Sequence, residues 1–202
     1  MSSTPSITVD QAINYLDILH KFIENDISAA IKAEANYLAA LGLSTYTEIM
    51  GGLYSGDLSG KARDLSQHYI CFINDFFHPD YKKVDSDLQR NNLKGLYGAV
   101  RSGLTHEYFI KKVSKIEIEY PPQQSVHCGI TFDPNSSPQI IFYVKQYFDD
   151  FKCAFAKYYS QLKFDDTGSM LSNFEKALQS INSSLLTKIY QNFSEDVSGK
   201  RP

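Results

Sequence analysis

Hydrophobic residues recur every three or four positions through the first half of the chain, which predicts amphipathic helices. The predicted helices cover about residues 8–40, 45–53, 60–77 and 83–103. Thr8 or Ser6 would cap the first helix, because a hydroxyl accepts a hydrogen bond from the free N–H groups at a helix start. Gly42 would end or kink that helix. Gly51 and Gly52 would end the second helix and let two helices approach closely.

The period of the pattern changes to two after about residue 115, where hydrophobic and polar residues alternate as they do in strands. Three short strands are expected, at about 115–120, 126–132 and 139–144. The loops between them are short and rich in proline, asparagine and serine, which favours hairpin-like connections. The expected sheet is therefore a small antiparallel meander covering about residues 115–144.

Two more amphipathic segments, about 145–163 and 169–192, end the chain before a polar tail, 194–202, that we expect to be disordered. The last helix has nearly a heptad spacing, which suits packing within the bundle or against a second copy of the chain. Together these elements predict a mainly α protein, a single domain over residues 1–202. It would be an up-down bundle of four to six helices with the β meander inserted after the fourth helix.

The composition is that of a globular domain: 202 residues, 43% hydrophobic and 21% charged. The fourteen tyrosines suit crowded helix surfaces or interfaces, and more simply the half-exposed edge of the core. The net charge of −3 is unlike the basic surface that many phosphate contacts require. Three cysteines without a close pair argue against a disulfide framework or a cysteine zinc site. The chain shows no secretion signal, and its apolar runs are far shorter than the roughly twenty residues of a membrane span. We expect a cytoplasmic protein without metal or cofactor.

One short stretch carries the groups that chemistry needs. It reads Leu-Tyr-Gly-Ala-Val-Arg-Ser-Gly-Leu-Thr-His-Glu-Tyr over residues 96–108, and it places Arg101, His106 and Tyr108 close together. The planar, permanently charged guanidinium of arginine suits phosphate oxygens, and imidazole exchanges a proton near neutral pH. These two groups suffice for metal-free RNA cleavage. Histidine handles the proton of the 2′-hydroxyl or of the leaving oxygen, and arginine stabilises the phosphorus centre.

The spacing of Arg101 and His106 sets a geometric condition. On a straight helix, side chains five residues apart point about 140° away from each other. The two groups converge if the helix ends near Gly103, or if each comes from a different subunit across a two-fold axis. A purely structural interpretation also exists, in which Arg101 stabilises a helix C-terminus and His106 fills a polar loop position.

The 96–108 stretch resembles the signature of the HEPN superfamily, in the branch written Arg-x-x-x-x-His-x-Tyr. The resemblance implies a helical bundle that forms a homodimer, with the catalytic Arg101 and His106 of both subunits lining one cleft. It also implies a metal-independent endoribonuclease of a toxin–antitoxin or defence system, with RNA as substrate and a nucleotidyltransferase-type antitoxin as partner. Tyr108 would be the site of nucleotidylation. Ser102, where active members often carry Asn, Asp or His, would support substrate binding through a hydrogen bond.

The sequence leaves a second function open. The slightly acidic charge and Ser102 also suit a non-catalytic HEPN-like module that uses its cleft or its β segment to bind a nucleotide or a protein. A third interpretation is an ordinary bundle in which the motif is structural.

Overall fold

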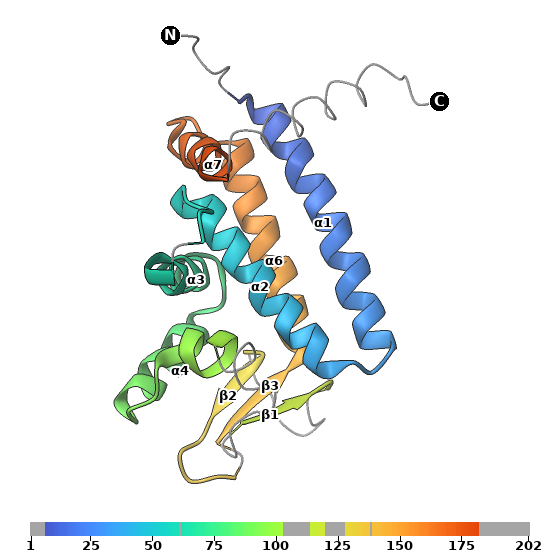
Figure 1. The fold of residues 1–202 in the computed structure, drawn as a ribbon, viewed down its shortest axis with the longest axis vertical. Coiled ribbons are helices and arrows are strands. Elements are labelled where there is room, and N and C mark those ends of the chain that lie inside the picture. The colour runs from blue at the N-terminus through green and yellow to red at the C-terminus, as the bar shows by residue number, and fades with distance from the viewer. Residues whose placement is uncertain (1–6, 61, 103–113, 120–127, 138, 182–202) are drawn as a thin grey trace.

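The computed structural model describes residues 7–60, 62–102, 114–119, 128–137 and 139–181, and shows a mainly α fold with a small sheet (Figure 1). The helices are α1 (Val9–Lys32), α2 (Asn36–Ser55), α3 (Ala62–Phe76), α4 (Pro79–Arg90), the short π-helix η1 (Tyr97–Ser102), α6 (Val144–Lys163) and α7 (Ser169–Ser180). The strands are β1 (Ser114–Glu117), β2 (Ile130–Phe132) and β3 (Ile140–Tyr143). A helical bundle with a small β insertion is thereby confirmed.

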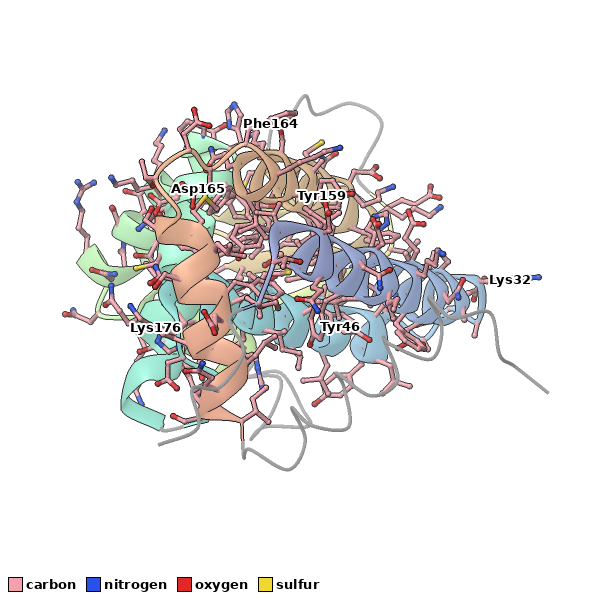
Figure 2. The ribbon with its side chains drawn as sticks, turned by 90° about the horizontal axis from the view of Figure 1, so that it is seen from above. Lys32, Tyr46, Tyr159, Phe164, Asp165 and Lys176 are labelled. Carbon is pink, nitrogen blue, oxygen red and sulfur yellow. The ribbon has the colours of Figure 1, made fainter. Side chains whose placement is uncertain are left out.

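Helices α1, α2 and α6 run side by side, and the sheet lies at one end of them (Figure 1). Viewed from above, side chains fill the space between these helices, whereas Lys32 and Phe164 project outward (Figure 2). The core is strongly aromatic. Four of its largest fully buried side chains are tyrosines, namely Tyr69, Tyr81, Tyr147 and Tyr158. The expectation that tyrosines would lie at helix surfaces, interfaces or the edge of the core is wrong for these four. The hydroxyls of Tyr69, Tyr81 and Tyr147 each have a hydrogen-bond partner, as buried tyrosine hydroxyls usually do.

The first helix starts as predicted and ends earlier. Thr8 caps it in a capping box: the Thr8 hydroxyl accepts from the Gln11 N–H at 3.3 Å, and the Gln11 side chain accepts from the Thr8 N–H at 2.9 Å. The chain leaves the helix at Glu34, which has a left-handed φ of 54°. Helix α2 then continues through Gly42, so the predicted break there is wrong. A Cβ at Gly42 would lie 2.9 Å from the Ile27 side chain, so this glycine serves the close approach of α1.

The adjacent glycines of α2 do not end the helix either. The predicted close approach of two helices is confirmed at Gly51, where a Cβ would lie 2.2 Å from the backbone oxygen of His68 on α3. Glycine is therefore needed at this position for packing rather than for a turn.

The predicted helix at 83–103 is in fact two elements. Helix α4 begins earlier, at Pro79, and ends at Arg90. The chain then turns through Asn92 and Gly95, which have φ values of 60° and 65°. Asp85 stabilises this turn, because its carboxylate accepts from the Leu96 N–H at 2.7 Å. The π-helix η1, which carries Arg101, is thus a separate short element.

The sheet is mixed rather than an antiparallel meander, so that part of the prediction is wrong. Its strand order is β1-β3-β2, with β1 parallel and β2 antiparallel to β3. Strand β3 is the most apolar and the most buried of the three, which accounts for its central position. Strand β1 carries Lys115 and Glu117 and lies at an edge, where charged side chains are tolerated.

Candidate functional site

Arg101 lies in the last turn of η1 and forms an ion pair with helix α2. Its Nε lies 3.1 Å from Oε2 of Glu48, and the two side chains are only 17% and 13% exposed. An ion pair shielded from water to this degree is screened less than a surface pair, and it orients both side chains. Because π-helical turns are rare and often occur at functional sites, η1 is a candidate position for one.

Tyr97 completes the contact from the start of η1. Its hydroxyl donates to the same Glu48 Oε2 at 3.3 Å, so one carboxylate oxygen receives both an aromatic hydroxyl and a guanidinium. Burial, and then the negative charge of Glu48, raise the pKa of the Tyr97 phenol. Tyr97 therefore remains a neutral hydrogen-bond donor well above neutral pH.

A line of buried hydroxyl groups begins at Thr47, the neighbour of Glu48 on α2. The Thr47 hydroxyl donates to the Leu43 carbonyl at 2.8 Å and lies 3.0 Å from the Tyr147 hydroxyl. The Tyr147 hydroxyl in turn lies 3.0 Å from that of Tyr69. Either hydroxyl of each pair can be the donor, so Tyr69, Tyr147 and Thr47 form one connected line of hydrogen bonds through the core. Burial raises the pKa of Tyr69, while the positive charge of Arg101 opposes that shift.

The predicted site residues are thus placed only in part. Arg101 has a defined environment, and Ser102 is the last residue of η1, although its side chain is not described. His106 and Tyr108 lie outside the described residues, as does Gly103, so the convergence of Arg101 with His106 stays a prediction.

Two residues of this site were missed by the sequence interpretation. Tyr97 lies inside the motif stretch but carries no obvious signal. Glu48 is 53 residues before Arg101, but it is the one charged residue of α2, in the sequence Ser-Thr-Tyr-Thr-Glu-Ile-Met. A lone carboxylate in an otherwise uncharged helix needs a partner of opposite charge when it is buried, and that was the available signal.

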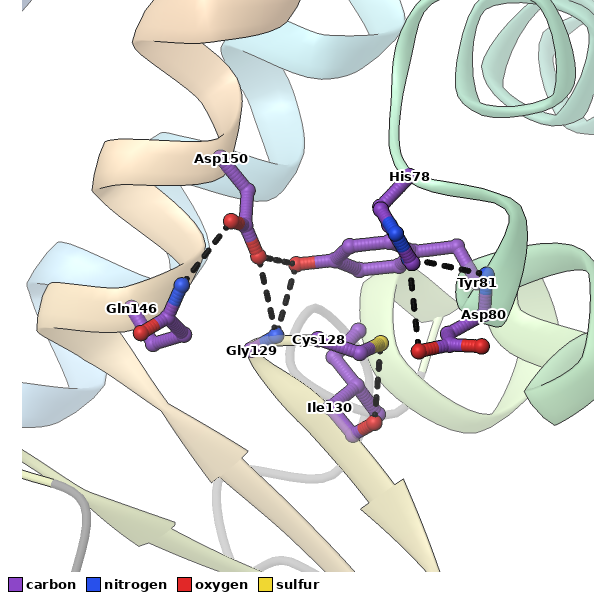
Figure 3. Close-up of polar contacts among 8 residues, drawn as sticks. All are labelled: His78, Asp80, Tyr81, Cys128, Gly129, Ile130, Gln146 and Asp150. Carbon is purple, nitrogen blue, oxygen red and sulfur yellow. Dashed lines mark hydrogen bonds and ion pairs between the residues drawn. The ribbon is translucent and has the colours of Figure 1, made fainter. Parts of the chain in front are cut away.

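A second polar cluster joins α4 to the sheet and to α6 (Figure 3). Asp150 on α6 accepts from the Tyr81 hydroxyl at 2.6 Å and from the Gly129 N–H at 3.0 Å. The Gly129 N–H also donates to the Tyr81 oxygen at 2.8 Å. The neighbouring Cys128 thiol is buried, and burial raises its pKa to about 12. A thiol that remains protonated at neutral pH is a poor nucleophile, so this cluster is a structural anchor of the sheet.

Within the described ranges, no group of three or more His, Cys, Asp or Glu side chains is arranged to hold a metal ion. No helix in the described part of the chain has both the length and the apolar character needed to cross a membrane. Comparisons with protein-family models, with curated proteins and with solved structures found no match for this chain.

Proposed function

We propose that this chain is a HEPN-like, metal-independent endoribonuclease that acts as a homodimer. In this proposal Arg101 stabilises the phosphate, His106 acts as general acid or base, and Ser102 and Tyr108 support substrate binding. The observation that carries it is the anchored position of Arg101, whose guanidinium is oriented by Glu48 at the end of η1, five residues before His106. A charge held in place before the reaction needs little reorganisation, which is the basis of electrostatic catalysis.

The reaction that these groups support is a transfer within the RNA strand. The ribose 2′ oxygen attacks the adjacent phosphorus, the bond from phosphorus to the 5′ oxygen breaks, and a 2′,3′-cyclic phosphate forms. His106 accepts the proton of the 2′-hydroxyl or delivers a proton to the leaving 5′ oxygen, and in a dimer the two imidazoles can divide these tasks. Arg101 offsets the charge that develops on the phosphate oxygens. No metal or cofactor enters any step.

The contact between Arg101 and Glu48 also bears on the alternative function. The pair balances the charge of Arg101 within the protein, which suits a non-catalytic module that binds a nucleotide or a protein. The two functions differ in one measurable respect, because only the enzyme turns RNA over in a manner that depends on His106.

The test is RNA digestion by the purified protein, with Arg101→Ala and His106→Ala compared with matched surface variants. Arg90→Ala removes an arginine that is 76% exposed, and His20→Ala removes a histidine that pairs with Glu24 on the surface of α1. We expect both motif variants to lose at least about a hundredfold in rate, both controls to retain activity, and a chelator to have no effect. Absence of cleavage, or equal cleavage by all five proteins, would exclude the ribonuclease and favour the binding module.

The wider setting follows from the same proposal. We place the protein in the cytoplasm as the toxin of a toxin–antitoxin or defence pair, with a nucleotidyltransferase as its neutralising partner. Incubation with a candidate nucleotidyltransferase and ATP should add one or more nucleotides to Tyr108, which mass spectrometry detects. A Tyr108→Phe protein that is modified to the same extent would contradict the assignment of that tyrosine.

A further inference from the structure

A cavity lies beside η1, on the side where α3 and α4 meet it. Its volume is about 440 Å³. The lining residues are Ser66, Gln67 and Ile70 of α3, Asp85 and Gln89 of α4, Lys94 in the turn before η1, and Tyr97 and Gly98 at the start of η1. Cavities of roughly 300–1,000 Å³ are typical of small-molecule sites, so this one has room for a nucleoside.

The charges of the lining favour a ligand without a large charge of its own. Asp85 and Lys94 contribute one charge of each sign. Both carboxylate oxygens of Asp85 already accept hydrogen bonds, from the Leu96 N–H at 2.7 Å and from the Gln89 amide at 2.7 Å. Asp85 thus serves the turn before η1, and the cavity as a whole does not concentrate a polyphosphate.

The remaining lining groups suit a flat polar ring. The Gln67 and Gln89 amide nitrogens already donate, to the Cys71 sulfur at 3.1 Å and to Asp85 at 2.7 Å, but each side chain also has a carbonyl oxygen that accepts. With the Ser66 hydroxyl and the Lys94 ammonium, these oxygens supply acceptors and donors like those that read the edge of a nucleobase. Ile70 and the ring of Tyr97 supply apolar surface against which such a ring can stack.

Tyr97 connects the cavity to Arg101. Its side chain lines the cavity, and its hydroxyl donates to the Glu48 oxygen that also pairs with Arg101. The two residues are four positions apart in η1, so a ligand against Tyr97 lies about one helical turn from the arginine.

We propose that the cavity beside η1 is the subsite for one unpaired base of the RNA substrate, which places a neighbouring phosphate of the strand against Arg101. The inference rests on the proposed ribonuclease function and names the substrate class of the same site. The substrate is single-stranded RNA, which the protein binds through a base as well as through its phosphates. This mode of binding accounts for a nucleic-acid enzyme with a net charge of −3.

The experiment is saturation-transfer NMR on the full chain with adenosine, guanosine, cytidine and uridine as separate probes. Transfer to the base protons of at least one nucleoside is expected. Ser66→Leu fills the cavity and should abolish the transfer, whereas Ser172→Leu makes the same change on α7 and should preserve it. Lys94→Ala retains the Cβ that packs on Gly98 and should weaken binding at least about fivefold without loss of fold.

Cleavage kinetics separate this inference from the function on which it rests. In Ser66→Leu the KM for RNA should rise about tenfold or more, while kcat at saturation stays within about twofold, because the chemical groups are untouched. If the protein binds a nucleoside but does not cleave RNA, the base-binding site stands and the ribonuclease proposal is refuted. RNA cleavage without transfer to any nucleoside, or with equal transfer in Ser66→Leu and wild type, would refute the base site and leave the ribonuclease standing.

Discussion

Replacing Tyr81 with Phe removes a single buried hydroxyl from the cluster in Figure 3. The ring of Tyr81 is fully buried, and its hydroxyl donates to Asp150 and accepts from the Gly129 N–H. Phe keeps the ring and removes only one oxygen atom, so almost all of the packing is retained. The change in unfolding free energy therefore reports the hydrogen bonds alone.

The magnitude follows from what each partner retains. The bond to the Asp150 carboxylate has a charged acceptor and is worth about 1.5–3 kcal/mol. The Gly129 N–H retains its 3.0 Å bond to Asp150, and Gln146 retains its 2.9 Å bond to the other carboxylate oxygen, so the remaining loss is small. We expect Tyr81→Phe to cost about 2–3 kcal/mol, which lowers Tm by roughly 4–12 °C in a chain of this size.

Tyr158 offers a matched control in the same core. It is as fully buried as Tyr81, but within the described part of the chain its hydroxyl has no hydrogen-bond partner. Removing an unsatisfied buried hydroxyl should leave stability unchanged or raise it by up to about 1 kcal/mol. Urea unfolding followed by circular dichroism measures both variants. Equal costs for Tyr81→Phe and Tyr158→Phe would refute the reasoning, because burial and not hydrogen bonding would then set the penalty.

Four other predictions concern single residues. Glu48→Gln removes the charge that balances Arg101, and it should cost about 1–3 kcal/mol in urea unfolding. Gly51→Ala should cost more than about 2 kcal/mol, because the new Cβ would lie 2.2 Å from a backbone oxygen; a neutral result would contradict the close helix contact. The exposed Cys153 thiol should react at once with a thiol reagent, and buried Cys128 only on unfolding. The folded pKa of Cys128, about 12, exceeds its ordinary value of 9.0, so its stabilising contribution is complete below pH 9 and lost as pH rises toward 12. Cys128→Ala should reduce that alkaline loss.

Local patterns sufficed for much of the fold. The periodic segments at 60–77 and 145–163 match α3 and α6 to within a few residues. An amphipathic helix can be identified from the spacing of hydrophobic residues within its own segment. The Thr8 cap was equally visible, since it depends only on residues within one turn.

Features that depend on distant partners could not be predicted in this way. Gly42 looks like a helix end in the sequence, yet it permits the close approach of Ile27 on α1. For Gly51 the close approach of a second helix was predicted, but the predicted helix end was wrong because α2 continues to Ser55. The left-handed turn at Glu34 contains no glycine or proline, the residues that would have indicated a turn in the sequence. The order of the strands depends on which one the bundle buries, and alternation along each strand carries no such information. The same limit applies to the site, because nothing local links Arg101 to a carboxylate 53 residues away.

Helix α2 joins the candidate site to the core. Glu48 contacts η1, while its neighbour Thr47 ends the hydroxyl chain that begins at Tyr69. Tyr69 also packs edge-on against Tyr97, with ring centroids 5.6 Å apart. These contacts form a closed ring. It runs from Tyr97 to Glu48, along α2 to Thr47, through the hydroxyls of Tyr147 and Tyr69, and back to the ring of Tyr97. A closed path of this kind leaves Arg101 little freedom to move separately from α2 and α3, so its position is a property of the packed bundle and not of the motif alone.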